Sequence, residues 1–374
     1  MESAGPLVIG LMSGTSLDGV DAVLVDFSEN PPRTLSTFWL PYPAEIRRQA
    51  LQLQAAGHDE VHRAALLANE LARCYAQAVR EVLAVAGVDA AQVAAIGCHG
   101  QTIRHQPAAG YSIQLNNPAL LAELTGIAVV ADFRSRDIAA GGQGAPLVPA
   151  FHAAVFGDPQ LHRVILNLGG IANLTDLNPR QPVRGFDCGP GNLLMDAWTE
   201  RHRGQRFDAG GQWAAQGQVL AELLQCLLAD AFFGANPPKS CGRDEFNNDW
   251  LERQLSGSER PEDVQATLLE LTAVSASAAI GRWCGSPQEL FVCGGGARNQ
   301  TLMARLQQHL PDCRVAGTDF LGQPADWVEA VAFAWLAWRT LRGEPGNLAE
   351  VTGAQGPRIL GAIYPRQEQM NLKT

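Results

Sequence analysis

The sequence predicts an α/β protein of two domains, for three reasons. Its 374 residues exceed the length of one ordinary domain. Apolar strand-length segments occur together with segments of helical periodicity. A pattern of strand, glycine turn and strand at residues 8–27 returns at residues 164–177, roughly 155 residues later, which indicates two domains that begin alike. Two unrelated hairpins are the alternative explanation of the repeat.

Composition narrows the class of partner. A formal charge of −10 offers no electrostatic reason to bind nucleic acid, since polyanion binding needs clustered Lys and Arg. No run stays apolar for the roughly 18 residues of a membrane span, and residues 7–11 read as a strand and not as part of a leader. The eight cysteines form no C-x-x-C pair, so we expect reduced thiols. We therefore expect a cytoplasmic protein without a membrane partner.

The shortage of lysine constrains the chemistry. Lys239 and Lys373 are the two lysines of the chain, and neither lies in a P-loop or a protein-kinase strand motif. Arginine can have replaced lysine through genome composition alone. If the protein handles ATP, backbone amides and a metal ion must therefore do most of the phosphate binding.

The elements follow in a regular order. Apolar spacing predicts a helix over residues 61–86 and then a buried strand over 93–97, which delivers His99 and Gln101 at its carboxyl end, where α/β sheets bind ligands. A strand over residues 127–131 leads to Arg134 and Arg136, and the glycines that follow are expected to be flexible. Later segments predict a helix from residue 193, a helix over 263–283, a strand over 290–293 and a helix over 327–341.

Three glycine-rich strand exits indicate a nucleotide site. Residues 13–19 combine backbone N–H groups, hydroxyls and a carboxylate, so the loop can cradle a polyphosphate while Asp18 holds Mg²⁺. An ordinary hairpin is the alternative for this turn alone. Comparable turns occur at Gly169–Gly170 and at residues 294–296, where glycine lets a ligand approach the backbone. Together they fit a nucleotide held in a cleft between two domains.

Single polar residues suggest the chemistry, each beside a plainer alternative. Asp187 follows a strand and precedes a glycine turn, so it can serve as a general base or as a helix N-cap. Arg134 and Arg136 suit a carboxylate-bearing substrate or a surface ion-pair cluster. Glu329 lies on an apolar helix, where it either contacts a ligand or faces solvent.

These motifs, taken in order, resemble the anhydro-N-acetylmuramic acid kinase family over nearly the whole chain. The strings that carry the resemblance are GLMSGTSLDGVD at residues 10–21, GCHGQTIRH at 97–105, ADFRSRDIAAGGQGAPLVP at 131–149, NLGGIAN at 167–173, GFDCGPGNLLMD at 185–196, KSCGR at 239–243 and VCGGGARN at 292–299. Cys241 is the one departure noticed, at a position where threonine is expected.

The resemblance implies an actin/hexokinase-like fold of duplicated ribonuclease H-like domains with a central cleft. It implies residues 1–150 as the N-terminal domain and 151–344 as the C-terminal domain, with residues 345–374 packing back on the first. It also implies a kinase that uses ATP and Mg²⁺ to open 1,6-anhydro-N-acetylmuramic acid hydrolytically and phosphorylate O6 in peptidoglycan recycling. A homodimer is expected from the family.

The resemblance and the motifs together assign the site residues. The catalytic residues would be Asp187 and, with it, Glu329, while the sugar would contact His99, Gln101, Arg134 and Arg136. The nucleotide would contact Gly14, Thr15, Ser16, Leu17, Asp18, Gly19, Val20, Asp21, Asn167, Gly169, Gly170, Gly294, Gly295 and Gly296.

Two other functions are possible on the same fold. A nucleotide-dependent sugar sensor would carry a DNA-binding helix pair ahead of the kinase-like domains, whereas the first glycine turn here begins by residue 10. An ATP hydrolase or chaperone would release ADP without added anhydrosugar.

Overall fold

The computed structural model describes residues 6–14 and 17–366, which form two compact units. The first unit comprises the chain up to Val155 and again from Trp327, and the second comprises Phe156–Asp326. This division differs from the expected one, because the chain returns to the first unit at Trp327. The helix at residues 327–341 therefore belongs to the first unit and not to a domain that ends at residue 344.

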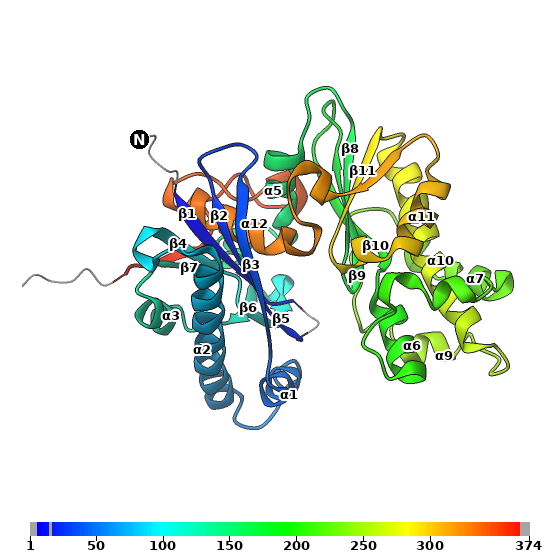
Figure 1. Cartoon of the computed structure of the whole chain (residues 1–374), viewed down its shortest axis with the longest axis horizontal. Coiled ribbons are helices and arrows are strands. Elements are labelled where there is room, and N and C mark those ends of the chain that lie inside the picture. The colour runs from blue at the N-terminus through cyan, green and yellow to red at the C-terminus, as the bar shows by residue number, and fades with distance from the viewer. Residues whose placement is uncertain (1–5, 15–16, 367–374) are drawn as a thin grey trace, which may run out of the picture. The chain divides into compact units, whose positions relative to one another are not determined.

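The first unit contains a six-stranded sheet of order β13-β7-β4-β1-β2-β3 (Figure 1). β1 to β3 form an antiparallel meander, β4 and β7 continue parallel to β1, and β13 closes the edge antiparallel to β7. The strands are β1 (Leu7–Met12), β2 (Gly19–Asp26), β3 (Arg33–Pro41), β4 (Val93–Cys98), β7 (Val129–Ala131) and β13 (Ala362–Tyr364).

The second unit repeats this plan with a five-stranded sheet of order β10-β9-β8-β11-β12. An antiparallel meander is again followed by two strands parallel to its first strand. The strands are β8 (Arg163–Leu168), β9 (Ile171–Leu177), β10 (Arg184–Pro190), β11 (Glu289–Cys293) and β12 (Arg314–Gly317). The repeat is thus a duplicated fold, and the predicted α/β, actin/hexokinase-type class is confirmed.

Helices cover both faces of the first sheet. Leu67, Leu71 and Tyr75 of α2 belong to the same buried apolar cluster as Ile9 and Leu11 of β1, while α12 lies on the opposite face (Figure 1). A small hairpin projects beyond β4. The remaining elements are α1 (Ala44–Gln52), α2 (Glu60–Ala86), β5 (Gln101–Gln106), β6 (Tyr111–Leu115), α3 (Pro118–Thr125), α4 (Ser135–Ala139), α5 (Val148–Phe156), α12 (Val328–Leu341) and α13 (Ala349–Thr352).

The core of the second unit surrounds helix α10 (Pro261–Ala279). With the turn that follows it, the segment Pro261–Cys284 is long and apolar enough to cross a membrane by length and composition, but 83% of the tested window is buried inside the unit. It therefore has the burial of a core helix. The other helices are α6 (Leu193–Arg203), α7 (Ala221–Leu228), α8 (Ala231–Gly234), α9 (Asn248–Glu252) and α11 (Gln300–His309).

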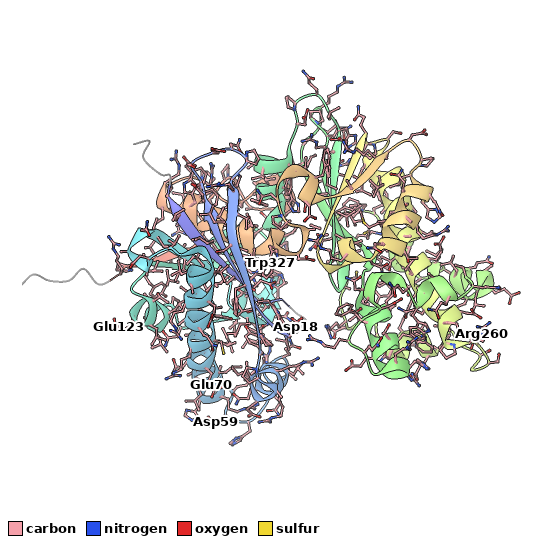
Figure 2. The ribbon with its side chains drawn as sticks, viewed as in Figure 1. Asp18, Asp59, Glu70, Glu123, Arg260 and Trp327 are labelled. Carbon is pink, nitrogen blue, oxygen red and sulfur yellow. The ribbon has the colours of Figure 1, made fainter. Side chains whose placement is uncertain are left out.

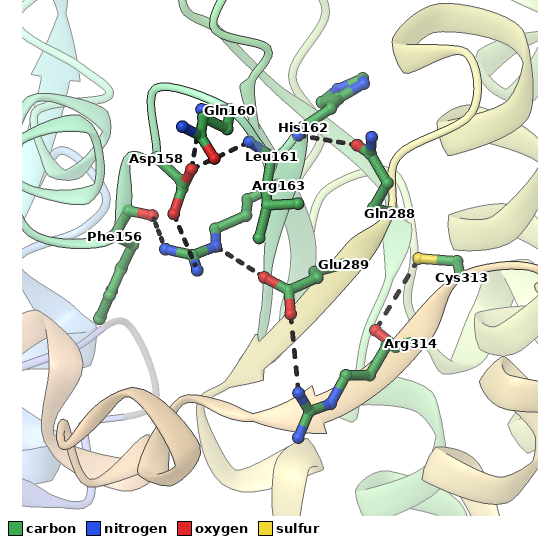
Figure 3. Close-up of polar contacts among 10 residues, drawn as sticks. All are labelled: Phe156, Asp158, Gln160, Leu161, His162, Arg163, Gln288, Glu289, Cys313 and Arg314. Atoms are coloured by element: carbon green, nitrogen blue, oxygen red, sulfur yellow. Dashed lines mark hydrogen bonds and ion pairs between the residues drawn. The ribbon is translucent and has the colours of Figure 1, made fainter.

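A polar network fastens the start of the second unit to its sheet (Figure 3). Arg163 on β8 donates to Glu289 on β11 (2.8 Å) and to the carbonyl of Phe156 (3.0 Å), and it pairs with Asp158 (3.3 Å). Glu289 also pairs with Arg314 on β12 (3.7 Å). Each half-buried charge in the network meets an opposite charge, which offsets its loss of hydration.

Two glycines let α12 lie directly on the first sheet. Gly10 and Gly97 are register partners on β1 and β4. A Cβ atom at Gly10 would lie 1.9 Å from the carbonyl oxygen of Ala330, and one at Gly97 would lie 2.1 Å from that of Phe333. The helix backbone therefore occupies the space of the missing side chains. This contact sets the position of the whole of α12, including Glu329.

We predict that Gly10→Ala destabilises the fold severely, because the added methyl group collides with backbone that cannot move alone. Overpacking of a core typically costs about 1–3 kcal/mol, and a backbone clash belongs at or above the top of that range. Gly281→Ala is the matched control, since a Cβ there meets nothing within 4 Å. Thermal unfolding measures both variants, and an unchanged midpoint for Gly10→Ala would contradict the packing described.

Candidate functional site

The hydroxyl of Ser13 faces the interior of the first unit. Its Oγ lies 2.6 Å from the hydroxyl of Tyr42 and 3.0 Å from that of Tyr75, and Ser13 is buried. Burial raises the pKa of both tyrosines, so they stay neutral hydroxyls. The first glycine turn was expected to offer this serine to phosphate, but the structure uses it as an anchor.

Backbone carbonyls hold the two ends of the same turn. The side-chain amide of Gln101 donates to the carbonyl of Gly14 (3.1 Å), and the N–H of Tyr42 donates to that of Asp18 (2.9 Å). Leu17 has a φ of 57°, a left-handed conformation uncommon for leucine. Thr15 and Ser16, both predicted nucleotide contacts, lie outside the described residues.

The last predicted members of this turn serve the sheet. A Cβ at Gly19 would lie 2.4 Å from the carbonyl oxygen of Leu40, so glycine there allows β2 and β3 to pack closely. Val20 is fully buried, and Asp21 is a half-buried residue of β2. Among the described residues of the turn, Gly14 and Asp18 remain the best placed to meet a ligand.

Asp18 provides the carboxylate that a metal site at this turn requires. It is half-buried and lies just before β2 in the first unit (Figure 2). Mg²⁺ in nucleotide sites usually takes one or two carboxylates and completes its shell with phosphate oxygens and water. A single carboxylate beside backbone donors therefore fits a phosphate-bound Mg²⁺ and does not fit an all-protein metal cage.

A second cluster joins the ends of three elements in the first unit. Arg134, after β7, donates from Nη2 to Nε2 of His99, after β4, at 2.8 Å. Its Nη1 donates to the carbonyl of Gly144 at 2.7 Å. The carboxylate of Glu329, at the start of α12, and that of Asp137 both favour the charged form of Arg134.

Burial dominates the electrostatics of this cluster. It lowers the pKa of His99 to about 3, with the charge of Arg134 as the second cause, so His99 is neutral. Burial also lowers the pKa of Arg134 to about 10, although the charges of Glu329 and Asp137 act in the opposite direction. Burial raises the pKa of Glu329, although the charge of Arg134 opposes that rise. Arg134 and Glu329 are both half-buried, so neither is a fully exposed surface residue.

Not every predicted sugar contact lies in this cluster. Arg136 is exposed on α4, so the structure does not bring it together with His99 and Arg134. Gln101 is fully buried, and its Oε1 has no hydrogen-bond partner among residues 6–14 and 17–366. That oxygen can accept a hydrogen bond from a group beyond those residues.

Asp187 lies at a bulge of β10 in the second unit. The register with β9 shifts between Asp187 and Gly189, and Gly189 has a φ of 139°. Bulges of this kind re-aim side chains next to functional sites. The N-cap position of α6 is occupied by Asn192, so the N-cap interpretation of Asp187 is wrong.

The carboxylate of Asp187 accepts a hydrogen bond from the backbone N–H of Cys241 at 3.0 Å. Burial raises its pKa to about 6, the nearby charge of Glu245 adds to the rise, and the Cys241 bond and Lys239 oppose it. The donor is the backbone N–H of residue 241. Cysteine at this position, in place of the expected threonine, therefore leaves the contact intact. A carboxylate with a pKa near neutrality suits proton transfer.

The glycine segments of the second unit meet at Leu168, the last residue of β8. A Cβ at Gly296 would lie 2.4 Å from that of Leu168, and one at Gly294 would lie 2.6 Å from Oδ1 of Asn167. The N–H of Gly191 donates to the carbonyl of Gly170 (2.9 Å), and that of Asn192 to the carbonyl of Gly169 (2.8 Å). Gly191, Gly294 and Gly296 therefore let loops pack closely, whereas a Cβ at Gly169, Gly170 or Gly295 would meet nothing closer than 3.7 Å.

A pocket of about 270 Å³ opens beside Gly295. Phe207, 60% exposed, provides an aromatic face, and Arg298 is held at the rim by Asp326 (2.8 Å) and Asp319 (3.1 Å). The lining residues are Asn192, Met195, Asp196, Phe207, Asp208, Gly210, Gly295, Arg298, Asn299 and Asp326. An aromatic ring, carboxylates and glycines without side chains are features that suit the binding of a nucleoside.

Sequence reasoning missed Tyr42, Tyr75, Phe207 and Arg298. The tyrosines and Phe207 lie far in sequence from every glycine turn, so no local pattern marks them. Arg298 follows the third glycine turn directly, and an arginine at that place could have signalled a ligand pocket.

Comparison with known proteins places the chain in one family. The family model described as "Anhydro-N-acetylmuramic acid kinase" matches residues 6–366. Curated proteins of that name are 60% identical in Nitrosospira multiformis, over 96% of this chain and 98% of the relative, and 59% identical in Thiobacillus denitrificans, over 96% of both. The relative from Bordetella pertussis is 57% identical, again over 96% of both chains.

Solved structures are more distant. The activator of the 2-hydroxyisocaproyl-CoA dehydratase from Clostridium difficile with bound ADPNP is 12% identical, covers 90% of this chain and 96% of its own, and gives a TM-score of 0.48. A glucokinase of the ROK family from Streptomyces griseus, in complex with glucose and AMPPNP, is 15% identical. The match covers 88% of this chain and 98% of the glucokinase and gives a TM-score of 0.42. These likenesses add nothing to what the sheet order already shows.

We predict that Tyr42→Phe lowers stability by about 1 kcal/mol, because it removes a hydrogen bond to the buried Ser13 hydroxyl. Tyr75 remains as a partner of that hydroxyl, so the loss should not be larger. Tyr111→Phe, at a 39% exposed position, is the control and should be neutral. Urea unfolding of both variants measures the difference, and equal midpoints would contradict the anchoring role.

Proposed function

The chain belongs to the anhydro-N-acetylmuramic acid kinase family, and we propose that it opens 1,6-anhydro-N-acetylmuramic acid hydrolytically and phosphorylates O6 with ATP. It is a sugar kinase, and its family relates it to cell-wall recycling. The products would be N-acetylmuramic acid 6-phosphate and ADP. The single observation that best supports this chemistry is the Asp187 carboxylate, with its pKa near 6 beside a strand bulge.

The substrate requires a base because its O6 is not free. O6 bridges to C1, so phosphoryl transfer cannot begin until the C1–O6 bond breaks. Ionised Asp187 takes a proton from water, the water oxygen bonds to C1, and the C1–O6 electron pair goes to O6. O6 then attacks the γ-phosphorus in line and ADP leaves, so one proton is released for each turnover.

Nucleotide and metal are assigned to separate groups of residues. The pocket at Gly295 would take the nucleoside, with the base against Phe207 and ribose hydroxyls near Asp326 or Asp208. The amides of the first glycine turn as far as Asp18, and those of the Gly169–Gly170 turn, would contact phosphates. Asp18 would hold Mg²⁺, which supplies charge neutralisation on the phosphates when bound.

The sugar is assigned to the cluster around Arg134. Its guanidinium suits the lactyl carboxylate, because arginine can bind two oxygens at once. Neutral His99 and the free Oε1 of Gln101 would meet hydroxyl or N-acetyl groups. Glu329 would orient water or the anomeric centre. The exposed Arg136 is left without a contact in this assignment.

The setting of the reaction is inferred from the family and the cosubstrate. We propose that the enzyme works in the cytoplasm, where ATP is available, and as a homodimer. Gel filtration with light scattering measures the oligomeric state.

We predict that Asp187→Asn abolishes turnover while ATP binding is retained, because the base is lost and the nucleotide contacts are not. Asp312→Asn, at an exposed position, is the control for an aspartate change elsewhere in the same unit. Coupled ADP release measures turnover and calorimetry measures nucleotide affinity. Wild-type-like activity of Asp187→Asn would remove this residue from the mechanism.

The pH dependence of the wild-type enzyme follows from the raised pKa of Asp187. The base acts in its ionised form, so kcat/KM should level off above about pH 6 and fall about tenfold per unit below it. A carboxylate of ordinary pKa would place the fall two units lower. An acid limb near pH 4 would contradict the assignment.

Turnover in ¹⁸O-labelled water tests the reaction itself. Label should appear at C1 of the 6-phosphorylated sugar and not in the phosphate. Product incubated in labelled water for the same time controls for exchange at the anomeric carbon. Label in phosphate, or ADP release that does not depend on the anhydrosugar, would instead support an ATP hydrolase.

A further inference from the structure

Asp137 is a buried carboxylate with three hydrogen-bond donors in the first unit. Its Oδ2 accepts from the backbone N–H of Gly144 (2.8 Å). Its Oδ1 accepts from Nδ2 of Asn347 (2.7 Å) and from Oγ1 of Thr352 (2.7 Å). Asp137 therefore ties the loop after α4 to a segment more than 200 residues later in the chain.

The two segments also pair through their backbones. The N–H of Gln143 donates to the carbonyl of Thr352, and that of Gln355 donates to the carbonyl of Ala140, both at 2.8 Å. A Cβ at Gly142 would lie 2.2 Å from Oδ2 of Asp137, so glycine is needed for the carboxylate to fit. The glycines at residues 141–144 were expected to be flexible, but this segment is fastened on both sides.

The fastened loop holds Arg134 directly. The carbonyl of Gly144 accepts from Nη1 of Arg134 (2.7 Å), and Nη2 of Arg134 donates to Nε2 of His99 (2.8 Å). An unbroken series of hydrogen bonds thus runs from Thr352 through Asp137, Gly144 and Arg134 to His99. Arg134 is also the residue to which the carboxylate of the sugar is assigned above.

We propose that Asp137 is a positioning residue, through which the segment at residues 347–355 sets the place of Arg134 and thereby the affinity for the sugar carboxylate. This inference rests on the proposed function. Guanidinium binding of a carboxylate depends on direction, because the paired N–H groups must face both oxygens. The Gly144 carbonyl accepts a hydrogen bond from Nη1 of Arg134. This bond fixes which N–H groups of Arg134 remain to face a carboxylate.

Charge supports the same arrangement. Arg134 is half-buried, and the negative charges of Glu329 and Asp137 help to keep it a cation. The carboxylate of Asp137 is buried and accepts three hydrogen bonds, so removal of one donor leaves a buried oxygen short of a partner. Loss of a donor from the C-terminal segment should therefore disturb Arg134 even though that segment touches neither Arg134 nor His99 in the contacts described.

Thr352→Val tests the link with little change of volume. The variant lacks the hydroxyl that donates to Asp137, and we expect KM for the anhydrosugar to rise about fivefold, the effect of one hydrogen bond, while KM for ATP stays within about twofold. Thr352→Ser keeps the hydroxyl and should restore the wild-type value. Asp137→Asn should raise the sugar KM further, by at least about tenfold.

Thr340→Val is the matched control. Thr340 is also buried and also fastens the C-terminal segment, through the carbonyl of Leu360, but it does not contact Asp137. Thr340→Val should lower Tm without changing the sugar KM. If both valine variants raise that KM equally, or if neither does, Asp137 has only a structural role and the proposal is overturned.

A spectroscopic readout does not depend on turnover. Arginine only donates, so Nε2 of neutral His99 accepts and its proton lies on Nδ1. The ¹⁵N resonance of Nε2, assigned with His99→Gln, should move in Thr352→Val and stay in Thr340→Val. If the wild-type enzyme does not turn over the anhydrosugar, the proposed function is wrong. If the His99 resonance does not move in Thr352→Val, the inference about Asp137 alone is wrong.

Discussion

The contact between α12 and two facing glycines governs the first unit. Because Gly10 and Gly97 lack side chains, the helix backbone lies against β1 and β4, and the residues along the contact are Ala330, Phe333 and Ala334. Phe333 then packs against the ring of His99 at 4.6 Å between centroids. This one contact between helix and sheet thus sets the depth of Glu329 and the orientation of His99. Through the hydrogen bond between His99 and Arg134 it also affects the position of Arg134.

Glycine has two separate uses in this chain, and sequence alone does not distinguish them. Gly169, Gly170 and Gly295 leave room around the backbone, whereas Gly19, Gly294 and Gly296 fill places where a Cβ would strike neighbouring atoms. All six lie in motifs that indicate a nucleotide site. The motifs therefore do not distinguish a glycine that leaves backbone accessible from one that lets two chain segments pack closely.

The fold was largely predictable because it depends on local patterns. The periodicity of α2, the apolar strands and the repeated hairpin are visible in the sequence, and each corresponds to an element of the structure. The domain boundary was less predictable, since the return of the chain at Trp327 depends on the contact of α12 with β1. No local pattern shows which of two similar sheets an apolar helix will cover.

The residues of the candidate site could be predicted where they directly follow a strand. They could not be predicted where a buried residue from a distant segment holds another residue in place. His99, Arg134 and Asp187 are near strand ends and could be named from sequence. Arg136 was named with Arg134, but a short helix turns its side chain to solvent. Tyr42, Tyr75 and the partners of Asp137 come from distant segments, and only the folded chain brings them to the residues they hold.

Arg134 and Asp187, each half-buried within its own unit, have their charges compensated in opposite ways, and this difference agrees with their proposed roles. Arg134 is balanced by two carboxylates, which help to keep it a cation despite burial. Asp187 has one backbone donor in the contacts described, and the neighbouring Glu245 adds to the rise of its pKa. A group that binds an anion must hold its charge, whereas a general base must exchange a proton near the working pH. Fuller compensation of Asp187 would lower its pKa and weaken it as a base.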